Sequence, residues 1–425
     1  MVRVANLKTE FLGMELKNPV GVTSCDFGGH ERLAKRVIDQ GIGWLVGKTV
    51  HKIDGPHRWP RPYFYSLKKF GPELKDSWTC SQMFHNMPYD EWLEKEAPKI
   101  LKLCKENECL YIASVSGIGT DVSTWVPLCE DMERIGCDAI ELDTGGPHAT
   151  FGAIAEQADV GAPLAMDPEK AYEITKACVD AVKVPIVFKM TPQCVNMASL
   201  ALSVERAGAA AISANNAFYG TWIDQETGSF YGGPYASGGL MGRAWQLFSL
   251  AKVLEITATV KTPVIGIGGI FTWDDCVRYM MGGAAVSGMC SAVYSRGVGV
   301  LKDAIDGMSE FMDRKGYGSV KDFTGICVPE FSYIRDYPRE ELMSEVSPVV
   351  AMFDMDKCNN CGVCSKLCPY AAIDSDDANV LSSNEYCMGC GWCMGHCTKD
   401  AVRMVLRSTG DVVWDGRGLP LEWAR

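Results

Sequence analysis

The sequence predicts an α/β fold, a (β/α)8 TIM barrel over residues 1–320 followed by a smaller, cysteine-rich domain. Apolar runs of strand length alternate with helical stretches, and eight such runs precede residue 320. The runs are nearly continuous in hydrophobicity, which is typical of parallel strands buried on both faces. They are Pro19–Ser24, Trp44–Thr49, Leu110–Ser116, Ala139–Thr144, Pro185–Met190, Ala210–Asn215, Pro263–Gly268 and Ala285–Ala292.

A doubly wound sheet is the alternative architecture. It would require a switch in strand order and usually a G-x-G-x-x-G turn after the first strand, which this sequence lacks. The helical patterns between most runs, such as residues 169–182 and 245–260, favour the barrel. The missing glycine motif also argues against a nicotinamide site on this chain.

Composition and charge exclude several classes of function. The chain has 425 residues, of which 47% are hydrophobic and 22% charged, and its net charge is −12. Bulk binding to nucleic acid requires a basic surface, so this charge argues against it. We find no apolar run of about 18 residues that would span a membrane. The N-terminal MVRVANLKTEFLG lacks the apolar core of a signal peptide, so we expect a cytoplasmic protein.

Cysteines are the strongest local signal. The chain has 19, and disulfides are disfavoured in the cytoplasm, so regularly spaced cysteines indicate metal ligation. Two runs share the spacing C-x2-C-x2-C-x3-C. The first run is Cys358, Cys361, Cys364 and Cys368, and the second is Cys387, Cys390, Cys393 and Cys397.

This double spacing is that of ferredoxins with two [4Fe–4S] clusters, in which the fourth cysteine of each run binds the other cluster. We therefore predict a ferredoxin-like 2[4Fe–4S] domain over residues 353–425, connected to the barrel by residues 321–352. Zinc is the alternative, although its sites generally use paired C-x2-C knuckles. The predicted ligands are Cys358, Cys361, Cys364 and Cys397 for one cluster and Cys387, Cys390, Cys393 and Cys368 for the other.

The C-terminal ends of barrel strands are where active sites form. Here two of these ends, Gly268-Gly269 and Cys290-Ser291, follow the seventh and eighth strands, where such barrels bind phosphate. Glycine amides can approach a phosphate closely, and a helix beginning at Ser291 would favour an anion. Gly238 and Gly239 in the preceding loop could add amides, although any single glycine can equally serve a turn.

Two lysines, Lys48 and Lys189, each follow a buried run, where a lysine rarely serves packing. A lysine against the N1/O2 edge of a flavin stabilises the charge that develops on reduction. The alternative is a side chain that extends to the barrel rim. The long aromatic segment after the second strand, residues 57–92, is expected to form a loop that either shapes a substrate pocket or covers the barrel rim with a hydrophobic cluster.

Several segments together carry a family resemblance. LKTEFLGMELKNPVGVTS, GKTV, VPIVFKMTP, GIGGI and MCSAV resemble dihydroorotate dehydrogenase-like FMN barrels. With the cysteine-rich tail, the chain is most similar to the catalytic subunits of bacterial NAD-dependent dihydropyrimidine dehydrogenases. The resemblance implies an oxidoreductase acting on CH–CH bonds. Electrons would pass through two [4Fe–4S] clusters to FMN and, as a hydride, to a cyclic conjugated substrate.

The resemblance also implies particular contacts and partners. A substrate contact is implied at Asn216. The implied electron donor is an NAD(P)-dependent flavoprotein subunit or a ferredoxin, in a homodimer or heterotetramer. FMN contacts are implied at Thr23, Ser24, Lys48, Thr49, Lys189, Gly239, Gly268, Gly269, Cys290 and Ser291.

The sequence departs from the family after the fourth strand. There the family has N-x-S-C-P-H, whose cysteine donates a proton to the substrate, but residues 143–148 read DTGGPH. Asp143 replaces the substrate-binding asparagine and Gly146 replaces the acid, which weakens the expectation of a pyrimidine substrate. The candidates for the missing acid are His148, Asp143 with a pKa raised by burial, Cys25 and Tyr219. The alternative function, which Gly146 favours, is an electron-transfer subunit without substrate chemistry of its own.

Overall fold

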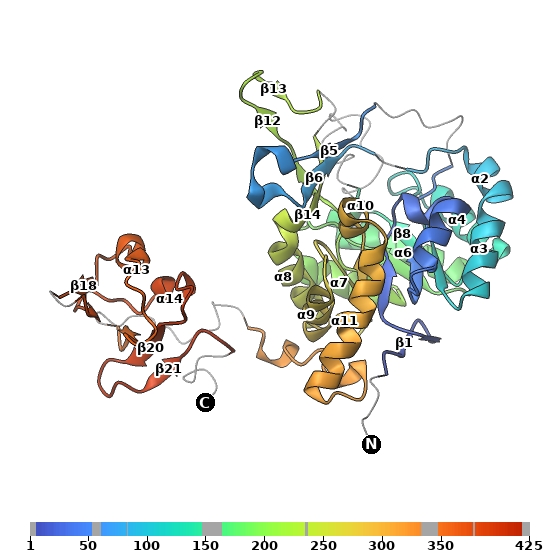
Figure 1. The fold of residues 1–425 in the computed structure, drawn as a ribbon. Helices are drawn as coiled ribbons and strands as arrows, with labels where there is room; N and C mark the ends of the chain where they lie inside the picture. Colours follow the sequence, from blue (N-terminus) through green and yellow to red (C-terminus); the bar gives the residue numbers. More distant parts are fainter. Residues whose placement is uncertain are drawn as a thin grey trace. The chain divides into compact units, whose positions relative to one another are not determined.

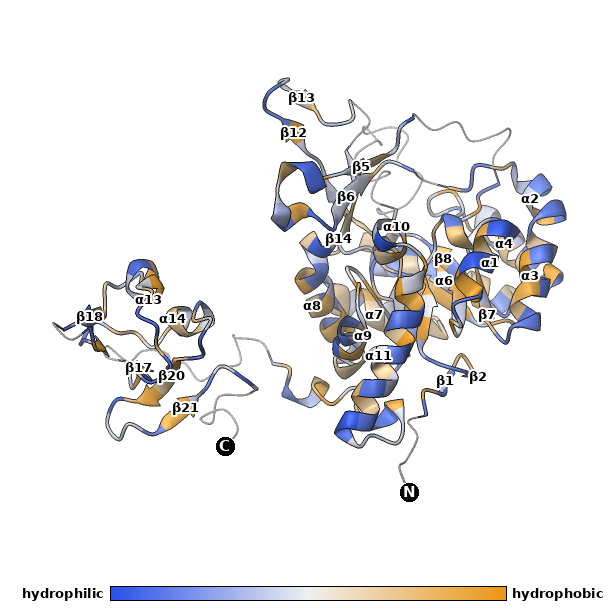
Figure 2. Cartoon of the chain, viewed as in Figure 1, coloured by the Kyte–Doolittle hydropathy of each residue, from blue (hydrophilic) through white to orange (hydrophobic). Residues whose placement is uncertain are grey.

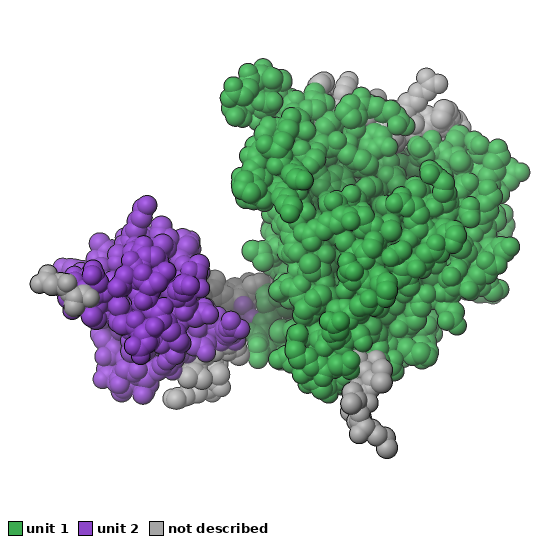
Figure 3. Space-filling model, viewed as in Figure 1, with its two compact units in different colours: residues 1–331 green, residues 332–425 purple. Residues whose placement is uncertain are grey.

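The computed structural model describes residues 6–52, 61–82, 84–146, 164–233, 237–332, 347–376 and 379–418. The chain divides into two compact units, residues 1–331 and 332–425 (Figure 3). In the ranges described, no helix combines the length and the hydrophobicity that a membrane span requires.

The first unit is a closed barrel of eight parallel strands surrounded by helices (Figure 1). The last strand pairs with the first, with Ser287 opposite Val20, and this pairing closes the sheet. Every run predicted to be a strand contains one, so the barrel prediction is confirmed. The strands are β3 (Val20–Val22), β4 (Trp44–Val46), β7 (Leu110–Val115), β8 (Ala139–Asp143), β9 (Ile186–Lys189), β10 (Ala211–Ser213), β15 (Val264–Ile267) and β16 (Val286–Met289).

The helices cover the outside of the barrel with amphipathic faces, and in Figure 2 helices such as α3 and α11 carry both hydrophobic and hydrophilic residues. Local signals set their ends. Helix α4, for example, begins where the Asp121 side chain accepts the Ser123 N–H and ends at Gly136, whose φ is +86°. The helices are α1 (Glu31–Ile38), α2 (Tyr89–Lys95), α3 (Ala97–Glu106), α4 (Val122–Ile135), α6 (Pro168–Ala181), α7 (Met197–Arg206), α8 (Gln246–Thr257), α9 (Trp273–Met281), α10 (Ser291–Arg296) and α11 (Gly299–Lys315).

An antiparallel hairpin packs against the inner core of the barrel. Its strands are β1 (Thr9–Phe11) and β2 (Met14–Leu16), and Phe11 and Leu16 belong to the same buried cluster as Trp44 and Ile112 inside the barrel. Phe11 and Leu16 are each only 2% exposed. The hairpin therefore fills the N-terminal end of the barrel and leaves chemistry to the C-terminal ends of the strands.

A second sheet of four antiparallel strands is built from two distant segments, in the order β11-β14-β6-β5. The segment after β4, predicted to be a loop, instead contributes two of these strands, so that prediction was wrong in part. Its partners come from the segment after β10, which also forms a small hairpin of β12 (Ile223–Asp224) and β13 (Ser229–Phe230). The four strands are β5 (Phe64–Ser66), β6 (Ser77–Cys80), β11 (Phe218–Gly220) and β14 (Gly238–Gly242).

The second unit holds the two cysteine runs on a small scaffold. Its described residues form a three-stranded antiparallel sheet, a two-stranded sheet and two short helices. Each helix begins after a glycine with positive φ, Gly362 at +70° and Gly391 at +75°. Residues 333–346 of the predicted connection lie outside the described residues. The elements are β17 (Val349–Phe353), β20 (Val402–Leu406) and β21 (Val412–Trp414), β18 (Ile373–Ser375) and β19 (Leu381–Ser383), α13 (Val363–Leu367) and α14 (Trp392–Gly395).

Candidate active site

Two cavities of about 810 and 520 Å³ lie at the C-terminal ends of the barrel strands and share six lining residues. All ten residues expected to contact FMN line one or both of them. The larger cavity also contains Cys25, Asp143, Gly146 and Asn216 in its wall. His148 lies outside the described residues. Tyr219 is on β11 but not among the residues lining either cavity.

Lys189 is held by two carboxylates. Its Nζ lies 3.3 Å from Oε1 of Glu141 and 3.5 Å from Oδ2 of Asp143. Burial alone would lower the pKa of Lys189, but Asp143 and Glu141 more than offset this and raise it. Burial raises the pKa of Glu141. The ammonium of Lys189 is therefore a fixed charge at the cavity wall.

Glu141 is a site residue that the sequence analysis missed. It is 1% exposed, inside strand β8, and it accepts a hydrogen bond from Ser114 at 3.1 Å as well as the ion pair. The available signal was a lone glutamate within the apolar run AIELD. A charge inside a buried strand needs a partner, and Lys189 on the neighbouring strand supplies it.

Asp143 and Asn216 bind one another. Nδ2 of Asn216 donates to Oδ1 of Asp143 at 2.8 Å, and Oδ1 of Asn216 accepts the Ala217 N–H at 2.7 Å. Oδ2 of Asp143 accepts a hydrogen bond from Thr49 at 2.7 Å. The aspartate therefore neutralises part of the lysine charge and fixes the orientation of the asparagine amide.

Lys48 approaches the larger cavity from the end of β4. It is 9% exposed, and its Nζ donates to Oε1 of Gln82 at 3.3 Å. Gln82 in turn donates to Oδ1 of Asp26 at 2.8 Å. The segment after β4 thus positions the second cation of the cavity wall.

The smaller cavity has a glycine turn and two buried polar atoms that suit a polar ligand. Gly268 and Gly269 have φ of +120° and +66°, and a Cβ on Gly269 would lie 2.7 Å from Cβ of Gln246. Oδ1 of Asn215 and Nε1 of Trp245 are buried with no hydrogen-bond partner among the residues described. Unpaired buried polar atoms are costly, so this lining fits the phosphate and ribityl part of FMN.

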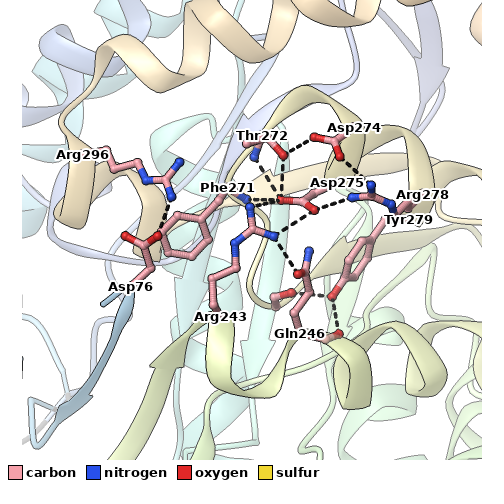
Figure 4. A network of polar contacts seen from close by, with 11 residues as sticks. Asp76, Arg243, Gln246, Phe271, Thr272, Asp274, Asp275, Arg278, Tyr279 and Arg296 are labelled. Atoms are coloured by element: carbon pink, nitrogen blue, oxygen red, sulfur yellow. Dashed lines mark hydrogen bonds and ion pairs between the residues drawn. The ribbon is translucent and has the colours of Figure 1, made fainter. Parts of the chain in front are cut away.

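A polar network fixes the chain just beyond the glycine turn (Figure 4). Asp275, on α9, is 0% exposed and accepts the N–H groups of Phe271 at 2.9 Å and Thr272 at 3.1 Å. Arg243 and Arg278 pair with its two oxygens at 3.0 and 2.8 Å. Burial alone would raise the pKa of Asp275, but these hydrogen bonds and Arg243 hold it below its usual range.

The same network reaches the second sheet. The guanidinium groups of Arg243 and Arg296 lie 5.1 and 5.0 Å from the ring centroid of Phe271. Arg296 also forms an ion pair with Asp76 (Figure 4). Strands of the second sheet, α10 and the turn after β15 are therefore joined by one set of contacts.

In the second unit, the cysteines surround two cavities. One is lined by Cys358, Cys361, Cys364 and Cys397, and also by Cys393. The other is lined by Cys368, Cys387, Cys390 and Cys393. The fourth cysteine of each run thus lies beside the first three of the other run, as a crossed pair of clusters requires.

Comparison with known proteins shows which families the chain matches. Residues 6–312 match the dihydroorotate dehydrogenase family, and residues 351–398 match the 4Fe-4S dicluster domain. Dihydroorotate dehydrogenase B (NAD(+)) catalytic subunits are among the relatives. That of Pyrococcus furiosus is 32% identical over 326 residues, 76% of this chain and 99% of the relative. That of Methanosarcina mazei is 31% identical over 317 residues, 74% of this chain and 93% of the relative.

These matches cover nearly all of each relative but leave about a quarter of this chain without a counterpart in them. The matched enzymes carry the name of dihydroorotate dehydrogenases rather than of dihydropyrimidine dehydrogenases. The family supplies FMN as the cofactor and oxidoreduction as the chemistry, and the C-terminal match supplies 4Fe–4S ligation. The chain is an oxidoreductase that belongs to the dihydroorotate dehydrogenase family and carries a 4Fe-4S dicluster domain.

Proposed function

We propose that this chain transfers electrons through two [4Fe–4S] clusters and FMN to the C=C bond of a cyclic conjugated substrate, as a dihydropyrimidine dehydrogenase-like enzyme. The observation that carries the proposal is the meeting of all ten expected FMN contacts around two adjoining cavities. The Gly268-Gly269 turn and the unpaired atoms of Asn215 and Trp245 suit the polar tail of the cofactor.

Bound FMN supplies hydride transfer. The residues of this chain have distinct roles around it. Lys189, fixed by Glu141 and Asp143, and Lys48, fixed through Gln82, would stabilise the negative charge that a bound flavin gains on reduction. Asn216, oriented by Asp143, presents a polar edge to the substrate side of the wall.

The lining of the larger cavity suits a planar ring. Phe64, Trp78, Phe84 and Tyr294 add aromatic surface to the larger cavity. This aromatic surface suits a planar ring, such as uracil or another cyclic enone or lactam.

The proposed electron donor is an NAD(P)-dependent flavoprotein subunit or a ferredoxin, in a homodimer or heterotetramer. The relatives support a multisubunit assembly, since their names specify a catalytic subunit and NAD(+). We also propose a cytoplasmic location, because thiolate ligands to iron persist in a reducing compartment.

The test is anaerobic purification followed by flavin and iron analysis. We expect one FMN and about eight iron atoms per chain. The dithionite-reduced protein is then mixed with uracil, orotate and other cyclic enones, and flavin reoxidation is followed by absorbance. Protein without FMN, or reduced protein that no ring compound reoxidises, would contradict the proposal.

The second candidate is an electron-transfer subunit without substrate chemistry, which Gly146 favours because the family acid is missing there. The two candidates differ in ligand binding. An enzyme of the first kind shows a change in its flavin spectrum when uracil or dihydrouracil binds, whereas a pure electron carrier shows none and exchanges electrons only with its partner.

A further inference from the structure

We propose that Cys80, on the sheet beside the barrel mouth, donates the proton that Gly146 cannot. This inference rests on the proposed function and identifies the acid of that reaction. A C=C bond that receives a hydride at one carbon requires a proton at the other. The reaction therefore requires a proton donor at the cavity, or a proton from water.

Position 146 has room for a side chain among the described residues. Gly146 lines the larger cavity, and a Cβ built on it would meet no atom of these residues within 4 Å. The structure thus keeps the room for a side chain at the family position but not the group. An acid acting on the same substrate must approach from another part of the wall.

Three thiols line this cavity, those of Cys25, Cys80 and Cys290. A hydrogen bond with Cys25, together with burial, raises the pKa of Cys290 well above its usual range. Cys25 is itself 5% exposed. The thiols of Cys25 and Cys290 are engaged with one another, whereas the Sγ of Cys80 accepts the N–H of Gln82. Cys80 and Cys290 are both partly exposed.

Cys80 is held firmly at the wall. It ends β6, with Gly239 of β14 and Phe64 of β5 as its neighbours across the sheet. Its Sγ accepts the N–H of Gln82 at 3.3 Å, and the side chain of Gln82 bonds Lys48. An N–H donor and a nearby ammonium stabilise the thiolate that remains after proton transfer.

The protonation state suits a donor. Burial raises the pKa of the Cys80 thiol to about 11, while Lys48 acts in the opposite direction. The titratable groups that interact electrostatically with the Cys80 thiol are Lys48, Asp26 and Cys290, from the ends of three neighbouring elements. Cys80 therefore carries its proton at neutral pH.

The step balances as follows. The substrate carbon that takes the hydride gains two electrons, and the adjacent carbon forms a C–H bond with the proton of Cys80. The S–H bond breaks, its electron pair stays on sulfur, and water returns a proton to the thiolate. Both electrons come from the reduced flavin that the proposed function already requires.

The test compares Cys80→Ala, the control Cys327→Ala and the double variant Cys80→Ala/Gly146→Cys with wild type, all loaded with FMN and iron. We expect Cys80→Ala to lower the substrate reduction rate about 10²- to 10⁴-fold with little change in KM. Cys327 is exposed and lines neither cavity, so Cys327→Ala should stay within about 3-fold of wild type. The added thiol at position 146 should restore at least about 10-fold of the loss, which a structural role of Cys80 would not predict.

A second measurement does not depend on turnover. Iodoacetamide labelling of Cys80, followed by mass spectrometry, should accelerate as pH rises toward 11 and slow when substrate is present. Unchanged turnover in Cys80→Ala, or labelling of Cys80 that substrate does not slow, would overturn the assignment alone. A wild-type protein that reduces no cyclic substrate would overturn the proposed function as well.

Discussion

Replacing Asp275 by asparagine tests how the turn after β15 is held. The variant keeps the size of the side chain but removes the charge that faces Arg243 and Arg278 in a position with 0% exposure. It also places an amide donor where N–H groups of Phe271 and Thr272 already donate. Breaking a buried ion pair from one side costs about 3–5 kcal/mol. Both arginines are partly exposed, so we expect the lower end, about 3 kcal/mol.

The assay is thermal unfolding of the barrel followed by circular dichroism at several pH values. A loss of about 3 kcal/mol should lower Tm by roughly 6–10 °C at pH 7, and FMN retention should fall because the glycine turn is adjacent. The pKa of Asp275 is lowered in the folded protein, so its contribution is present above the unfolded value, about 3.9, and is lost as pH falls through the folded value. The difference between wild type and variant should therefore shrink below about pH 4.

Asp274→Asn is the matched control. Asp274 lies beside Asp275 and pairs with the same Arg278, but its side chain is 36% exposed. An exposed pair contributes at most about 1 kcal/mol, so this variant should melt within roughly 3 °C of wild type. The reasoning is refuted if Asp275→Asn melts with wild type, or if the two variants lose the same stability.

Three further predictions concern other parts of the site. Lys189→Met leaves the carboxylate of Glu141 buried without its cation. Calorimetry should therefore show that the free energy of unfolding falls by about 3–5 kcal/mol, and the FMN content should drop. An unchanged melting curve would contradict this. Gly269→Ala places an alanine at a position with positive φ, with its Cβ 2.7 Å from Cβ of Gln246. FMN binding measured by fluorescence should therefore weaken, and stability should fall by about 1–3 kcal/mol. Normal FMN binding would show that the turn tolerates a side chain. Cys368→Ser should remove iron from the cluster held by the second cysteine run and leave the cluster of the first run intact. Mössbauer or EPR spectra would distinguish the two clusters. Loss of the first-run cluster alone would exclude crossed ligation.

Much of the fold could be read from the sequence because parallel barrel strands are local, continuous signals. A run such as VPIVFK is buried on both faces wherever its neighbours lie, so its identity as a strand does not depend on knowing its partners. Because all barrel strands are parallel, Lys48 and Lys189, which lie at the C-terminal ends of two of them, are placed at the same end of the barrel. Cysteine spacing likewise determined which thiols lie near one another in the second unit.

The rest depended on contacts between residues far apart in the sequence. Strands β5 and β6 are short, and β5 alternates between exposed and buried residues, so their own sequence resembles a loop. They are stabilised by the pairing of β6 with β14, which comes from a distant part of the chain. Asp143 was considered as an acid, but its pairing with Asn216 and Thr49 could not be known before the ends of three strands were placed together. The role of Cys80 as part of the cavity wall was hidden for the same reason.

The pairing of β6 with β14 has a practical consequence for changing substrate preference. Cys80 faces Gly239 across this pairing, so a residue of the proposed acid segment and a residue of the proposed cofactor segment share one ladder of backbone hydrogen bonds. If only one of the two segments were replaced by that of a relative, the new strand would pair with a strand that it does not match. Recombination libraries built on this scaffold should therefore exchange both segments together.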